Sequence, residues 1–185
     1  MACRKINKRY ADEGYVIKEI EWDNSFTNKS NLKFPYYNHP YQEELNKIFD
    51  EINLNKIARQ AITQQYNEIY IYNDANAKEK NILAPQVKIY PSYFNLPSIM
   101  YPKFYPLIKE EEVWNLNEDD MFVRLGIKLQ WFGIHYSQYK DFINRVKDLC
   151  ENFSLCADDI LKNPSNIGYH AVLGLRIIDY GLMEN

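Results

Sequence analysis

The stretch VRLGIKLQWFG, residues 123–133, carries the most regular pattern in the chain. Apolar residues occupy every second position from 123 to 131, and polar residues or glycine separate them. The apolar set is Val123, Leu125, Ile127, Leu129 and Trp131. An alternation of period two predicts a β-strand with one buried face. We therefore expect Trp131 to lie in the core, where its replacement by alanine would cost about 3–5 kcal/mol of stability.

A helix is expected next, from about Ser137 to Phe153, because apolar residues recur there at intervals of three and four. These residues are Tyr139, Phe142, Ile143, Val146, Leu149, Cys150 and Phe153. A loop over about 158–164 then leads to a last strand over about 169–180.

The first part of the chain predicts a strand, an arm and a helical region. Residues 15–22 alternate as a strand, and residues 23–40 have no regular pattern and predict a loop or an extended arm. Residues 41–66 show helical spacing whose phase changes at 53–55, so either one helix bends there or two short helices meet. A short strand is expected over 67–72.

Prolines and aromatic residues gather in the segment 84–108. It holds five of the eight prolines together with Tyr90, Tyr93, Phe94, Tyr101, Phe104 and Tyr105. Prolines at this density exclude a helix interior and a central strand. Six exposed rings would forgo roughly 1.5–3 kcal/mol of burial each, so the segment must pack. Two alternatives stay open, namely edge strands and turns on its own core, or contact with a neighbouring subunit.

These elements predict an α+β fold in which two main amphipathic helices pack on one face of a mostly antiparallel sheet. At 185 residues we expect a single domain, 1–185. Residues 1–40 would form a strand and an extended N-terminal arm, and residues 41–185 the α+β core with its extended segment.

The net charge of −3 argues against binding nucleic acid by bulk electrostatics. The single basic cluster lies near the N-terminus and comprises Arg4, Lys5, Lys8 and Arg9. This cluster is either an arm that touches phosphate or an acidic neighbour, or a solvated terminus. Nucleic acid is thus expected at most at this arm or, if copies of the chain assemble into a ring, in the lumen of that ring.

The three cysteines, at positions 3, 150 and 156, suggest neither a disulfide framework nor a zinc knuckle, and they fit a reducing compartment. No apolar run reaches the length of about 18 residues that a membrane span needs, so no membrane partner is expected. We expect the protein to be made and kept in a cytoplasm.

No motif for catalysis, phosphate binding or metal binding is found. The six glycines form no phosphate loop, and none of the three histidines stands in a zinc-binding frame. His135 is expected to be a helix-start residue, and the acids at 118–120 and 158–159 are expected to form turns and caps. We predict no catalytic residue, no metal, no cofactor and no small-molecule substrate. The sequence does not show which carboxylates from distant segments meet in the fold, so a small metal-dependent enzyme remains an alternative.

The expected strand 123–133 and helix 137–153, with the elements expected at 41–66, 67–72 and 86–94 before them, resemble the core of phage tail-terminator and tail-completion proteins. The resemblance covers about residues 41–153. It implies a subunit of a ring at the head–tail neck, without catalysis or cofactor, in a virion assembled in the host cytoplasm. It also implies that the partners are copies of the chain and other virion proteins.

We therefore expect a structural virion protein that forms a ring at the phage neck or tail end. An alternative is a small phage-encoded inhibitor that binds a host defence or regulatory protein, and a metal-dependent enzyme is the third possibility. The expected interface residues are Arg4, Lys5, Lys8, Arg9, Tyr90, Tyr93, Phe94, Tyr101, Phe104 and Tyr105.

Overall fold

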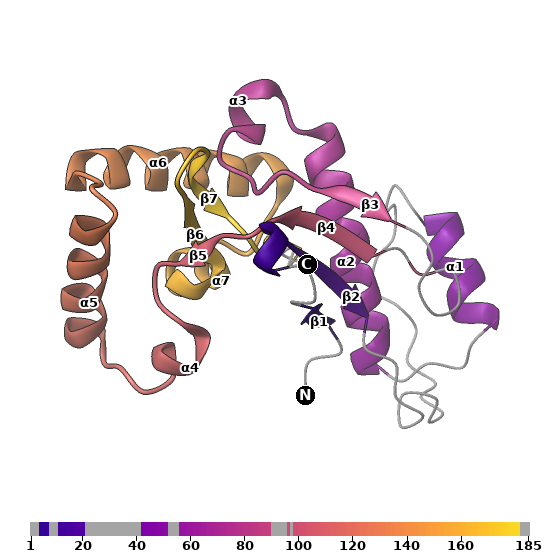
Figure 1. Cartoon of the computed structure of the whole chain (residues 1–185). Helices are drawn as coiled ribbons and strands as arrows, with labels where there is room; N and C mark the ends of the chain where they lie inside the picture. The colour runs from indigo at the N-terminus through magenta and orange to yellow at the C-terminus, as the bar shows by residue number, and fades with distance from the viewer. Residues whose placement is uncertain are drawn as a thin grey trace. The chain divides into compact units, whose positions relative to one another are not determined.

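The computed structural model describes residues 4–7, 11–20, 42–51, 56–89, 96 and 98–181. They divide into two compact units that alternate along the chain (Figure 1). Unit 1 holds the described residues of 4–74 and 85–102, and unit 2 holds those of 75–84 and 103–181. Helices and antiparallel strands occur together, which confirms the α+β fold class.

Unit 1 contains a four-stranded antiparallel sheet with the strand order β1-β2-β4-β3. Its strands are β1 (Arg4–Asn7), β2 (Tyr15–Ile20), β3 (Val87–Ile89) and β4 (Ser98–Pro102). β2 confirms the strand expected over 15–22. The exclusion of a central strand from the proline-rich segment is wrong, because β4 lies between β2 and β3. Pro102 is the last residue of β4, so its missing N–H falls at the end of the ladder.

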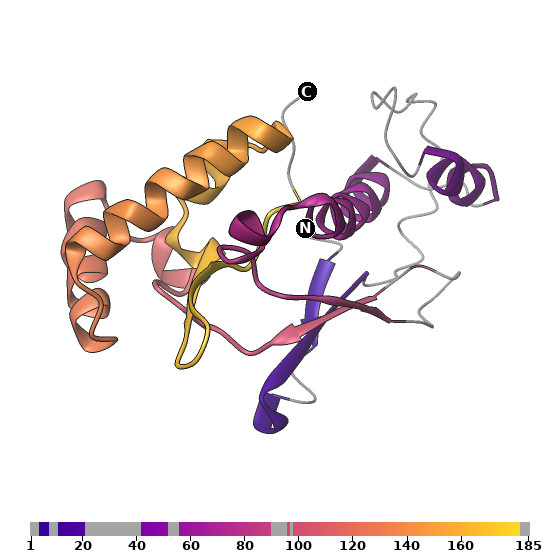
Figure 2. The ribbon, with the colours of Figure 1, turned by 90° about the horizontal axis from the view of Figure 1, so that it is seen from above.

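Two α-helices belong to the described part of unit 1, α1 (Gln42–Glu51) and α2 (Lys56–Asp74). The strand expected over 67–72 is wrong, because these residues continue α2. Ile62, Tyr66 and Ile69 are buried at helical spacing, and this packing overrides the local preference of the isoleucines and tyrosines for strands. Figures 1 and 2 show α2 as a layer along one face of the sheet.

Unit 2 contains a three-stranded antiparallel sheet with the order β5-β6-β7. Its strands are β5 (Tyr105–Pro106), β6 (Ile167–His170) and β7 (Gly174–Ile177). The single strand expected over 169–180 is wrong, because the chain turns back after His170. The ring Nδ1 of His170 accepts the N–H groups of Val172 and Leu173 at 3.1 and 3.2 Å, and Gly174 adopts a φ of +74°.

The segment 75–84 belongs to unit 2 because β7 binds it through the main chain. The N–H of Ile177 donates to the carbonyl of Ile82 at 2.8 Å, and the N–H of Ala84 donates to the carbonyl of Ile177 at 2.9 Å. The guanidinium of Arg176 adds a bond of 2.7 Å to the carbonyl of Lys80. These bonds explain why the two units alternate along the sequence.

The α-helices of unit 2 are α3 (Ala77–Lys80), α4 (Glu110–Val113), α5 (Glu118–Trp131), α6 (Tyr136–Phe153) and α7 (Ala157–Leu161). Short 3-10 helices are η1 (Ala11–Glu13) in unit 1 and η4 (Pro164–Asn166) in unit 2. α6 confirms the helix expected over 137–153. Four of its expected apolar residues are buried, namely Phe142, Val146, Leu149 and Cys150.

The strand expected over 123–131 is wrong, because these residues form most of helix α5. Residues at its two ends explain why a helix forms. The side chain of Asn117 accepts the N–H of Asp120 at 2.8 Å, which caps the N-terminus. Three acids fill the first turn, where the helix dipole favours negative charge. Gly133, with a φ of +70°, follows the C-terminus.

Candidate protein interface

Helix α5 carries two apolar stripes on nearly opposite sides. One consists of Met121, Leu125 and Leu129, and we call it the inner stripe. The other consists of Val123, Ile127 and Trp131, and we call it the outer stripe. Members of one stripe are four residues apart and therefore share a side. Two residues turn a helix of about 3.6 residues per turn by about 200°, so the two stripes face apart.

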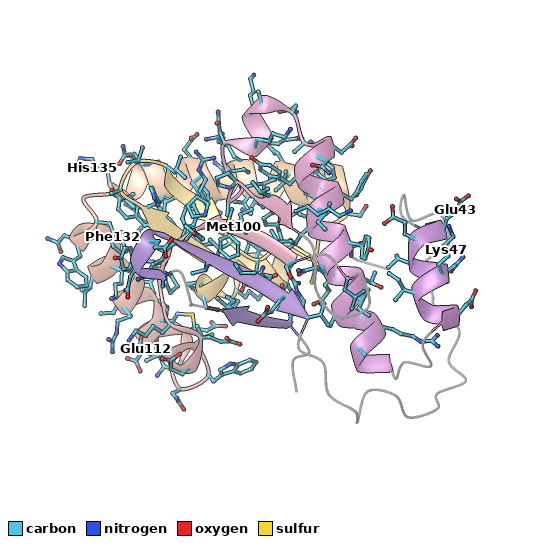
Figure 3. The ribbon with its side chains drawn as sticks, turned by 45° about the vertical axis from the view of Figure 1, so that its right-hand side comes forward. Glu43, Lys47, Met100, Glu112, Phe132 and His135 are labelled. Atoms are coloured by element: carbon cyan, nitrogen blue, oxygen red, sulfur yellow. The ribbon has the colours of Figure 1, made fainter. Side chains whose placement is uncertain are left out.

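The inner stripe is buried at its C-terminal end, and Met121 and Leu125 are partly exposed. Leu129 is 3 % exposed, and the carbonyl of the same residue accepts the N–H of Ile134 at 2.9 Å. Just after the helix, the ring of Phe132 stacks on Tyr169 of β6 with centroids 4.6 Å apart. Figure 3 shows Phe132 and His135 at the corner between α5 and α6. The C-terminal end of α5 is thereby fixed to the rest of unit 2.

The outer stripe is exposed within the part of the chain that the structure describes. Val123 is 60 % exposed, Ile127 is 57 % exposed and Trp131 is 76 % exposed. The expectation that Trp131 lies in the core is therefore wrong. Trp131 contacts Lys128, whose Nζ lies 4.8 Å from the ring centroid. Large apolar side chains gathered on one side of a helix mark a surface that another molecule covers.

A groove runs along the outer stripe. It is lined by Leu116, Asp120, Val123, Arg124, Ile127, Lys128 and Trp131. Its acidic residue lies near the N-terminal end of α5, and its two basic residues lie farther along the helix. Arg124 is paired with Glu112 of α4 at 3.6 Å, and Glu112 is labelled in Figure 3. The groove therefore combines an apolar floor with an ordered set of charges.

Helix α5 is short, and most of its residues are exposed to solvent. The helix has 14 residues, and Leu129 is the buried one among them. Isolated helices shorter than about 12–15 residues are marginal in water, and a helix that is apolar all round is normally buried. Covering an apolar side chain of this size contributes roughly 1.5–3 kcal/mol. The outer stripe is thus suited to contact with another protein surface.

The structure places Arg4, one of the expected interface residues, in a buried ion cluster. The guanidinium of Arg4 donates to the carboxylate of Glu68 on α2. The Nζ of Lys18 on β2 donates to the same carboxylate at 2.8 Å. Lys5 belongs to β1, and residues 8 and 9 lie outside the described residues. Arg4 thus joins the N-terminal strand to α2.

The expected aromatic interface is divided between buried and exposed rings. Tyr101 is buried in unit 1, where the Nζ of Lys18 lies 5.6 Å from its ring centroid. Phe104 is buried in unit 2 and lies 5.5 Å from the ring of His170. Tyr105 is exposed. Tyr90, Tyr93 and Phe94 lie outside the described residues, and the role of all six in an interface stays a prediction.

The titratable residues singled out in the sequence lie at the starts of helices. His135 precedes α6 as expected, and its N–H donates to Gln138 at 2.9 Å. The acids at 118–120 and 158–159 occupy first turns of α5 and α7.

Burial, reinforced by Tyr136, raises the pKa of Tyr139 to about 12, so its hydroxyl stays protonated near neutral pH.

No group of three or more histidine, cysteine or acidic side chains in the described ranges is arranged to hold a metal ion. Among the helices that the structure describes, none is both long and apolar enough to cross a membrane.

Reasoning from the sequence missed the outer stripe of α5, because a strand would bury all five alternating residues on one face. The signal that could have revealed it lies at the ends of the run. Asn117 followed by three acids is a helix-start pattern, and Gly133 suits a helix end. Between helix caps, an alternation such as that of residues 123–131 indicates two opposite apolar stripes.

Comparison of the chain with protein-family models, with curated proteins and with solved structures gave no match.

Proposed function

We propose that this chain is a structural protein that works by assembling with other protein chains, and that the outer stripe of α5 is one of its contact surfaces. The observation that carries the proposal is the exposure of Val123, Ile127 and Trp131 on a short helix that buries Leu129 on its opposite side. A protein that worked alone would leave these side chains in water, where they contribute no burial.

The form of assembly that we propose is a ring at the neck or tail end of a phage virion, built in the host cytoplasm. The resemblance that suggested this form relied on a strand at 123–133, and α5 occupies that position. Support for assembly therefore comes from the surface of α5, and the resemblance supplies only the place in the virion. We propose no catalytic step and no cofactor.

Light scattering of the purified chain over a range of concentrations tests this proposal. We expect a discrete assembly that forms as concentration rises, with ring-shaped particles in negative-stain electron microscopy. Ile127→Asp places a charge in the outer stripe and should lower the mean mass of the assembly at a given concentration. Val172→Asp is the matched control, because Val172 is 85 % exposed on the turn between β6 and β7 and lies outside the groove.

A monomer at every concentration, without particles, would contradict the proposal. It would favour the alternative in which the chain inhibits a host protein.

A further inference from the structure

We infer that the molecule covering the outer stripe is α5 of a second copy of this chain, lying antiparallel to the first. The inference rests on the proposed function, because it names the partner of the surface proposed there. Its basis is the order of charges in the groove. Asp120 stands near the N-terminal end of the outer stripe, and Lys128 stands two turns farther toward the C-terminal end.

Two copies of α5 bring opposite charges together along the groove only when the two helices run in opposite directions. In an antiparallel pair, Asp120 of each copy comes beside Lys128 of the other copy. In a parallel pair, aspartate would face aspartate and lysine would face lysine, and such like-charge contacts oppose association. The order of charges therefore fits a second copy of the helix in the antiparallel direction and opposes the parallel one.

The same register gives the apolar residues partners. When Asp120 lies beside Lys128 of the second copy, Trp131 comes to the level of Asn117 of that copy. Leu116, next to Asn117, lines the same groove and offers the tryptophan an apolar contact. Each of the two tryptophans then has an apolar partner in the other copy.

In this register Arg124 lies at the centre of the pair, so Arg124 of one copy would lie beside Arg124 of the other copy. Glu112 already pairs with Arg124 in each chain, at 3.6 Å, and this carboxylate offsets the repulsion between the two guanidinium groups. The cluster at the two-fold axis would therefore contain two arginines and two glutamates, with no net charge.

The expected contact is small and symmetric. A pair of short helices covers less than the roughly 1,200–2,000 Å² of a standard interface, so we expect association that depends on concentration. A two-fold contact closes a pair and does not by itself generate a ring. In a ring, this contact would join two stacked rings, or a second contact surface would link the pairs.

Single charge reversals and their mixture test the inference. Asp120→Lys alone places lysine against lysine twice in each pair, and Lys128→Asp alone places aspartate against aspartate twice. At low ionic strength, each variant alone should raise the dissociation constant of the pair by roughly tenfold, measured by sedimentation equilibrium. An equimolar mixture should recover association, because both contacts of a mixed pair are attractive. Native mass spectrometry counts the mixed pairs.

Matched controls separate pairing from helix stability. Asp119→Lys removes a first-turn acid of the same helix outside the groove, and Lys147→Asp reverses an exposed lysine on α6. Both should leave the dissociation constant unchanged. Circular dichroism and thermal unfolding should show that every variant is folded.

The possible failures are distinguishable. If each single variant still associates as the unchanged chain does, the pairing through α5 is wrong and the copies meet through another surface. Assembly of the chain, the first part of the proposed function, then stands, and the outer stripe is not the contact between copies. If the single variants dissociate but their mixture does not recover, the antiparallel arrangement is wrong. If the unchanged chain is a monomer at every concentration, both the pairing and the proposed function are wrong.

Discussion

At the scale of single residues, Leu129 and Trp131 show how burial decides the effect of a substitution. The two residues are two positions apart and both belong to the alternating pattern, yet Leu129 is 3 % exposed and Trp131 is 76 % exposed. A strand would have placed both on one face. In the helix they lie on opposite sides, so the same change to alanine has different consequences.

We predict that Leu129→Ala lowers the free energy of unfolding by about 2–5 kcal/mol, because it leaves a cavity under α5. Trp131→Ala should change it by less than about 0.5 kcal/mol in the dilute protein, as for an exposed site. Urea unfolding at low protein concentration measures both. A large loss for Trp131→Ala under these conditions would show that the ring is buried within the single chain.

The ion cluster around Glu68 supports a second prediction at this scale. Glu68 is 2 % exposed and binds both Lys18 and Arg4. Glu68→Gln should lower the free energy of unfolding by about 3–5 kcal/mol, because it removes the buried negative charge that Lys18 and Arg4 share. Adding Lys18→Met to Glu68→Gln should restore part of that loss. Equal stability of the double and single variants would mean that the lysine carries no such penalty.

At the scale of elements, periodicity predicted α6 correctly and gave strands in place of α5 and of the end of α2. The spacing over 137–153 correctly gave α6, because its apolar residues lie on one side of a helix that packs on one side. In α5 two opposite sides are apolar, and their interleaved stripes imitate a strand. In α2 buried isoleucines and tyrosines imitate one as well, and only packing against the sheet reveals the helix.

Two further features depended on contacts that the sequence does not display. β4 is a central strand although prolines surround it, because Pro102 falls at its end. The last strand became a hairpin because His170 ties the turn. The outer stripe was missed as a site because the interleaved stripes of α5 predicted a strand, and a strand would have buried both stripes on one face.

We predict that Gly126→Ala stabilises α5. Gly126 lies inside the helix, and a Cβ added there meets no atom within 4 Å. Alanine in a helix interior is favoured over glycine by about 1 kcal/mol. Thermal unfolding followed by circular dichroism should show a higher midpoint. A lower midpoint would mean that the residue is not in an exposed helix.

At the scale of the whole molecule, we propose that a second chain covers the side of α5 that the first chain leaves exposed. On one side the helix buries Leu129, and on the other side the outer stripe meets solvent among the residues described. Assembly would supply the missing contact and stabilise the helix by mass action. Stability of α5 should therefore depend on protein concentration, whereas that of helices packed within one unit should not.

Hydrogen exchange of the backbone amides at two protein concentrations tests this central claim most directly. Peptides from 118–131 report on α5, and peptides from 136–153 report on α6 as the internal reference. We predict that the amides of α5 exchange more slowly in the concentrated sample, while those of α6 exchange at the same rate in both. Equal exchange of α5 at both concentrations would contradict the account, because it would show that nothing in the sample covers the outer stripe.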